Sequence, residues 1–171
     1  AMAIKLVGIF ANVLRWQVAS GRQAPDPFSV QRQSAFRGRP IPVVTKSEFR
    51  RTGFTEAHLR GSPFNGWTTV SVLVEHCRRL VGAGERLVYA YYPGVDTVAH
   101  EYGLGAVGDE GSYLAGELAF ADELVERLLA VLPDDVALVV TADHGQVEVE
   151  EWLSLESLQA GVSAIAGEGR F

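Results

Sequence analysis

The sequence has one cysteine, no excess of positive charge and no long uninterrupted apolar run. Cys77 alone cannot form an internal disulfide, which suits a reducing compartment. No run approaches the roughly 18 apolar residues that a membrane-spanning helix needs. Acidic residues outnumber basic ones by 21 to 15, so no overall positive field attracts a phosphate backbone or an anionic membrane. We therefore expect a cytoplasmic chain that binds neither a nucleic acid polymer nor a membrane, although an upstream export signal in a longer parent would be compatible with these residues.

What the chain has is apolar material for a core. It has 171 residues, of which 47% are hydrophobic, and this predicts one globular domain over residues 1–171. Residues 1–45 are the least regular part and are expected to form short strands, such as "KLVGIF", and a loop excursion. The span 19–40 contains three prolines in a polar setting, which is typical of a long exposed connection whose role stays open.

Two helices are predicted from apolar periodicity. In "WTTVSVLVEHCRRLVGAG" the apolar residues recur at helical spacing, and Gly82 and Gly84 provide the end. Ser112 can cap a second helix that ends before Pro133. Its predicted apolar face consists of Leu114, Leu118, Ala121, Val125, Leu128 and Leu132.

Two apolar runs, 86–92 and 136–142, are predicted to be buried strands. Together with the two helices they give the order helix, strand, loop, helix, strand, which is typical of a βαβ unit over residues 66–146. The predicted fold class is α/β, with a mostly parallel sheet and helices on both of its faces. A short helix near 154–160 and a strand from about Val162 are expected to follow.

Acidic and histidine side chains follow both predicted strands. Asp96 and His100 come after the first, and Asp143 and His144 close the second. Carboxyl ends of parallel strands meet at one edge of a sheet, where ligands bind, so the two pairs are expected to converge. Carboxylate and imidazole together suit Zn²⁺ better than Mg²⁺ or Ca²⁺. Two such ions about 3.5–4 Å apart would form a clamp suited to phosphoryl transfer.

Simpler interpretations stand beside the metal site. Asp-x-x-x-His also occurs as a surface pair, and Asp-His-Gly as a polar turn. His58 and His76 are predicted to be structural or solvated, and Cys77 to be a buried thiol on a helix face. The tyrosines that flank the proposed edge either pack in the core or contact a substrate base; they are Tyr91, Tyr92 and Tyr102.

The segments "VYAYYPGVDTVAHEYG" and "LVVTADHGQ", in this order and separated by one helix, resemble the alkaline phosphatase superfamily. The similarity covers about residues 86–146 and is greatest to the nucleotide pyrophosphatase/phosphodiesterase branch. It implies an alkaline-phosphatase-like sheet and two zinc ions that activate a threonine or serine nucleophile. By this resemblance Asp96 and His100 are ligands of the zinc that activates water, and Asp143 and His144 are ligands of the zinc that holds the nucleophile.

Other parts of the family pattern have no counterpart in the chain. The pattern includes an aspartate after the first strand, an upstream nucleophile and a third histidine downstream. Thr68 and Thr69 are the only nucleophile pair of interest, and they lie closer to the Asp96 strand than the resemblance implies. We therefore expect the chain to be part of a longer enzyme's domain, with no catalytic nucleophile of its own and no activity in isolation.

The predicted function is that of a metal-dependent hydrolase of phosphodiester or pyrophosphate bonds in nucleotide-like small molecules. A phosphomonoesterase or a cofactor-independent phosphoglycerate mutase-like enzyme of the same superfamily is the first alternative. A non-catalytic metal-binding module is the second. The physiological substrate, the substrate-binding residues and the oligomeric state stay open.

Overall fold

The computed structural model describes residues 3–6, 9–12, 16–18, 23–106 and 109–148. The backbone forms two compact units. Of the described residues, one unit includes those before Ile41 together with Phe49–Ser62, and the other includes Ile41–Glu48 and those from Pro63 to Glu148. This division does not test the prediction of a single domain, which stays a prediction. The elements expected near 154–160 and from Val162 lie outside the described residues.

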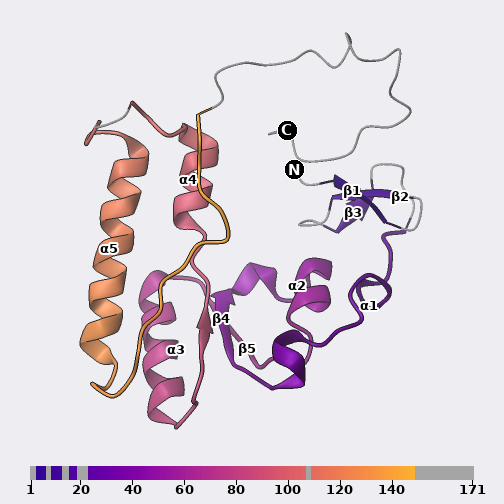
Figure 1. The fold of residues 1–171 in the computed structure, drawn as a ribbon, viewed down its shortest axis with the longest axis horizontal. Helices are drawn as coiled ribbons and strands as arrows, with labels where there is room; N and C mark the ends of the chain where they lie inside the picture. The colour runs from indigo at the N-terminus through magenta and orange to yellow at the C-terminus, as the bar shows by residue number, and fades with distance from the viewer. Residues whose placement is uncertain (1–2, 7–8, 13–15, 19–22, 107–108, 149–171) are drawn as a thin grey trace. The chain divides into compact units, whose positions relative to one another are not determined.

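The first unit contains a small antiparallel sheet of order β1-β2-β3 (Figure 1). Its strands are β1 (Ala3–Leu6), β2 (Ile9–Asn12) and β3 (Gln17–Val18). The register pairs Leu6 with Ile9, so the prediction of one strand over "KLVGIF" is wrong.

Short helical turns occupy the predicted loop. They are α1 (Pro27–Val30) and the 3₁₀ turn η1 (Ala35–Gly38). The Asp26 carboxylate caps α1 by accepting a hydrogen bond from the Phe28 amide at 3.1 Å. Local capping therefore orders part of a segment whose composition alone predicted an irregular loop.

A small apolar cluster holds the first unit around Trp16. Its indole packs with Ala57, which lies on α2 (Gly53–His58), and donates a hydrogen bond to the Pro25 carbonyl at 2.6 Å. Gly53 begins α2 directly against this indole, so a Cβ at that position would overlap the ring. Thr52 caps the helix by accepting from the Thr55 amide at 3.2 Å.

The second unit is built on a parallel sheet of order β5-β4-β6. Its strands are β4 (Val43–Lys46), β5 (Phe64–Trp67) and β6 (Tyr89–Ala90), and the 3₁₀ turn η2 (Ser47–Phe49) follows β4. Helix α3 (Val70–Gly82) connects β5 to β6, with β4 between them. The predicted α/β class with a parallel sheet is confirmed, although the strand predicted over 86–92 is only two residues long.

Helices α3 and α5 (Tyr113–Val131) form the core of this unit with the sheet. The predicted cap of α5 is confirmed, since the Ser112 hydroxyl accepts from the Ala115 amide at 3.1 Å. The predicted face is only partly right: Leu128 is buried, but Leu118 is 51% exposed and Leu124 is buried in its place. Apolar residues surround much of α5, so the pattern alone did not fix which side packs on α3. The buried core residues are Val44, Trp67, Leu73, Cys77, Leu124 and Leu128.

The second predicted buried strand, 136–142, is absent from the structure. Figure 1 shows this stretch as an irregular connection after α5. Val139 and Val140 are 82% and 69% exposed, while Leu138 packs against the core. A strand requires a neighbour for its backbone hydrogen bonds, and the described sheet ends at the two-residue β6. The βαβ unit predicted from strands 86–92 and 136–142 is therefore wrong for the described residues, and the parallel sheet instead contains a unit of β5, α3 and β6.

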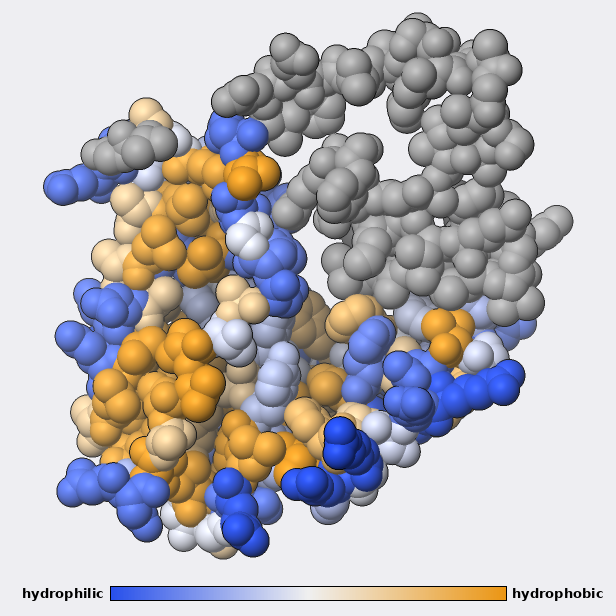
Figure 2. Space-filling model, in the orientation of Figure 1, coloured by the Kyte–Doolittle hydropathy of each residue, from blue (hydrophilic) through white to orange (hydrophobic). Residues whose placement is uncertain are grey.

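Exposed apolar side chains gather over α5 (Figure 2). They include Leu118, Phe120 and Leu129. Of the helices within the described ranges, none combines the length and the apolar character required to cross a membrane. The predicted compartment stays a prediction.

Candidate metal centre

Helix α4 (Gly94–Tyr102) carries the first predicted donor pair. Asp96 and His100 lie four residues apart, one turn along the same side of the helix. The distance from His100 Nε2 to Asp96 Oδ1 is 3.5 Å. Gly103 ends the helix with a φ of +77°, a conformation that favours glycine. The Asp-x-x-x-His spacing therefore lies on a regular helix.

The second donor pair reaches the first without a strand beneath it. His144 Nε2 lies 3.8 Å from Asp96 Oδ1 and 3.9 Å from Asp143 Oδ2. The predicted convergence of the two pairs therefore appears in the structure, with Asp96 next to both histidines. The side chains of Asp96 and Asp143 differ in exposure, at 45% and 87%.

These distances bear on whether the side chains fit a zinc ion. Ligand atoms about 2.0–2.1 Å from a tetrahedral zinc lie about 3.3 Å from one another, which is close to the 3.5 Å and 3.8 Å found around Asp96. Carboxylate oxygen and imidazole nitrogen are also suitable donors. Among the described residues, however, no three or more acidic, histidine or cysteine side chains form a group able to hold an ion. The side chains therefore suit zinc in the chemistry of their ligand atoms and in the distances between pairs of them.

The imidazole of His144 is oriented by its own backbone. Its Nδ1 lies 2.9 Å from the Gly145 carbonyl oxygen. Because a carbonyl oxygen only accepts, Nδ1 carries the proton, and Nε2 keeps its lone pair on the side of Asp96 when the ring is neutral. The Asp143 carboxylate accepts from the His144 amide at 3.2 Å and so holds the turn. A hydrogen bond of this kind at the remote nitrogen is typical of histidines that bind metals.

Gln146 is a site residue that sequence reasoning missed. Its side-chain Nε2 donates to Asp96 Oδ1 at 2.8 Å, across 50 residues of sequence. Of the two terminal atoms of the Gln146 side chain, only the nitrogen can donate to a carboxylate, so the partner determines how this amide is oriented. The available signal was its position two residues after His144, at the same predicted edge.

Comparison of the sequence with known protein families identifies the family of the chain. Residues 19–162 match the family model described as "Type I phosphodiesterase / nucleotide pyrophosphatase". The chain belongs to this family. No curated protein and no solved structure matches it.

In this chain of the phosphodiesterase family the three tyrosines near the proposed ligands have different environments. Burial raises the pKa of Tyr91, and the charges of Asp96 and Asp143 raise it further. The rings of Tyr102 and Tyr113 lie 4.4 Å apart, and both side chains are exposed. Tyr92 instead packs against the core, as the simpler interpretation predicted.

The remaining candidates have local partners. His58 Nδ1 lies 3.0 Å from the Phe54 carbonyl, and His76 Nε2 lies 3.3 Å from that of Gly66, so both have structural contacts. Cys77 is buried, and burial raises its pKa to about 11, which disfavours the reactive thiolate. The Thr69 and Ser71 hydroxyls lie 3.0 Å apart at the start of α3.

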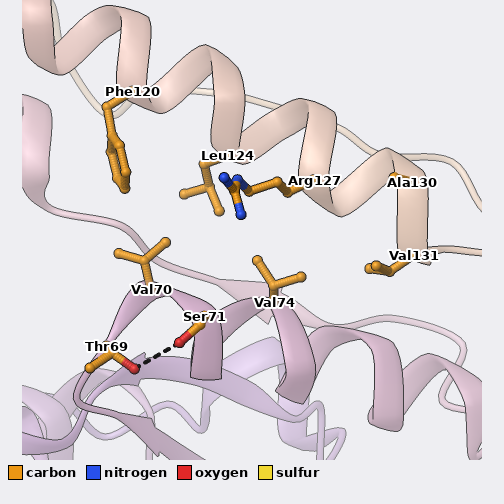
Figure 3. A pocket seen from close by; sticks show the side chains of 9 residues that line it. All are labelled: Thr69, Val70, Ser71, Val74, Phe120, Leu124, Arg127, Ala130 and Val131. Atoms are coloured by element: carbon orange, nitrogen blue, oxygen red, sulfur yellow. Dashed lines mark hydrogen bonds between the residues drawn. The ribbon is translucent and has the colours of Figure 1, made fainter.

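A groove of about 560 Å³ lies between α3 and α5 in this family member (Figure 3). Its lining is mostly apolar, with the Arg127 guanidinium and the Thr69–Ser71 hydroxyl pair as its polar groups. None of the four predicted metal donors lines it. The lining residues are Thr69, Val70, Ser71, Val74, Phe120, Leu124, Arg127, Ala130 and Val131.

Proposed function

We propose that the chain supplies metal ligands for the zinc-dependent hydrolysis of phosphodiester or pyrophosphate bonds in nucleotide-like molecules. The observation that carries this proposal is the approach of His100 and His144 to one oxygen of Asp96, within a chain of the phosphodiesterase family. The family match favours this function over the phosphomonoesterase and phosphoglycerate mutase-like alternatives.

Each pair has its own role in the proposal. Asp96 and His100 hold an ion on the water side, and Asp143 and His144 hold an ion on the nucleophile side. When bound, two zinc ions supply a lowered pKa for a coordinated hydroxyl or water and positive charge for the phosphoryl oxygens. Gln146 steadies Asp96 by donating to Oδ1, and the Gly145 carbonyl fixes the His144 ring so that Nε2 is the ligand atom.

The nucleophile is proposed to lie outside the described residues. Thr69 is the described hydroxyl of interest, but its neighbour is the Ser71 hydroxyl, and it lines the groove between α3 and α5. Neither feature connects it to Asp96. The chain on its own is therefore expected to bind metal without turnover.

The first test is zinc binding by the chain, measured by isothermal titration calorimetry. His100→Ala and Asp143→Ala should each weaken binding by at least about 10-fold, since even outer-shell partners of a metal typically contribute that much. His76→Ala is the matched control and should bind like the unchanged chain, because its ring contacts the Gly66 carbonyl. Absence of zinc binding by the unchanged chain would overturn the proposal.

The second readout is hydrolysis of bis-p-nitrophenyl phosphate with zinc and with a chelator. We expect no zinc-dependent turnover by the chain alone. Turnover that needs zinc and disappears in Asp143→Ala would support the metal site, and it would overturn the placement of the nucleophile outside the described residues. Thr68 and Thr69 would then be the residues to replace next.

A further inference from the structure

Helix α4 begins without a side-chain cap, although it carries two of the proposed ligands. Its N-cap residue is Pro93, whose side chain makes no capping hydrogen bond. By contrast, Ser112 caps α5 through its hydroxyl. The first turn of a helix has unsatisfied amide groups and tends to fray unless something holds it. Asp96 lies in that first turn.

A hydrogen bond between Tyr92 and Glu117 lies directly against this turn. The Tyr92 hydroxyl donates to Glu117 Oε1 at 2.5 Å, joining the residue before Pro93 to helix α5. Burial, followed by the bond to Glu117, raises the pKa of Tyr92, so its hydroxyl stays protonated and remains a donor. The ring lies between Trp67 of β5 and Phe120 of α5, with centroid distances of 6.2 and 6.1 Å.

Gly94 shows how closely this pair approaches α4. A Cβ at position 94 would overlap both the Tyr92 hydroxyl and Glu117 Oε1. Its φ lies outside the left-handed region, so the backbone does not require glycine there. The space taken by the Tyr92–Glu117 pair therefore accounts for a glycine in the first turn of α4.

We propose that Tyr92 and Glu117 are positioning residues that hold the first turn of α4, and with it Asp96, in register for metal binding. The proposal rests on the function proposed above, because Asp96 matters here as a ligand. In the proposal both residues act through the backbone of residues 92–96. Glu117 belongs to α5, so the pair connects the site to the helix that packs on α3.

The test compares Co²⁺ affinity with stability and with local exchange in the same variants. Co²⁺ binds the same nitrogen and oxygen donors as zinc and has visible d–d bands that report ligand geometry. Tyr92→Phe and Glu117→Ala should weaken Co²⁺ binding by about 10-fold, the low end of the effect of outer-shell partners, and shift the bands. Glu117→Gln keeps an acceptor oxygen and should recover most of the affinity. Glu126 lies at an exposed position on α5, the helix that also carries Glu117, so Glu126→Ala is the control and should change neither the Co²⁺ affinity nor the d–d bands.

Gly94→Ala separates positioning from simple stability. Alanine favours helix over glycine, which offsets part of the cost of moving the two side chains, so the change in thermal stability should be small. The methyl group would displace the ends of the Tyr92 and Glu117 side chains, so Co²⁺ affinity should nevertheless fall to a similar extent. A Gly94→Ala chain with unchanged affinity and unchanged bands would overturn the proposal.

Amide exchange in residues 94–98 of the metal-free chain gives an independent readout. Tyr92→Phe and Glu117→Ala should exchange faster there, while α3 should be unaffected. If the unchanged chain binds no Co²⁺ but these variants still exchange faster, the function proposed above fails and the structural contact stands. If the chain binds Co²⁺ and the variants match it in affinity and exchange, the positioning role is wrong and the metal site stands.

Discussion

The two donor pairs of the site lie on very different supports. Asp96 and His100 sit on a regular helix that packs beside α5, whereas Asp143 and His144 sit in an irregular segment whose apolar residues Val139 and Val140 face solvent. One support is determined by local sequence and by contacts within the second unit. The other depends on a sheet neighbour that the described residues lack. The two proposed ligand pairs therefore approach each other although only one of them lies on a regular element.

The largest difference between the helical part and the irregular segment should appear in the free energy of unfolding of their variants. Leu73 lies on the buried side of α3 and is 1% exposed, so Leu73→Ala should reduce the free energy of unfolding by about 2–5 kcal/mol. Val140→Ala removes an exposed side chain and should change it by less than about 0.5 kcal/mol. Urea unfolding of both variants measures the difference. A comparable loss for Val140→Ala would mean that 136–142 is a buried strand in solution.

The next contrast concerns the ligands. Asp96 lies within 3.8 Å of both histidine rings, whereas Asp143 Oδ2 lies 3.9 Å from the His144 ring and the Asp143 side chain is far more exposed. Asp96→Ala should therefore weaken zinc binding by about 100-fold and Asp143→Ala by about 10-fold, the two ends of the range seen for residues that support metal sites. Calorimetric titration measures both values. Equal losses would show that the irregular segment holds metal as firmly as α4.

The smallest effect concerns Gln146, which connects the two supports. Losing its hydrogen bond to Asp96 should speed amide exchange in residues 143–146 of Gln146→Ala by about fivefold, equivalent to about 1 kcal/mol. Val147→Ala, a change at an exposed neighbour, is the control. Exchange that is unchanged in Gln146→Ala would mean that this hydrogen bond does not hold the segment.

Local patterns in the sequence predicted the parts of the fold that depend on local interactions. Apolar spacing predicted α3 and α5, and Ser112 predicted where α5 begins. The four donors were found because acids and histidines are conspicuous after apolar runs. Whether a run such as 136–142 becomes a strand depends on its neighbours in space, and its apolar residues carry no information about them. This is why the strand prediction was wrong.

Side-chain contacts between distant residues were equally invisible. Tyr92 and Glu117 are 25 residues apart, and Gln146 and Asp96 are 50 apart. A tyrosine after a strand and a glutamate in an amphipathic helix are ordinary in their local context. Only the packing of α4 along α5 makes the first pair meaningful, and it also accounts for Gly94.

The buried thiol of Cys77 makes the chain well suited to site-specific labelling. With its pKa raised to about 11 and its side chain inside the core, it should react slowly with maleimides near neutral pH. A cysteine introduced at an exposed position on α5 would then be the reactive thiol of the folded chain. One fluorophore there and a metal in the site would form a quenching pair, which would allow metal binding to be followed in real time.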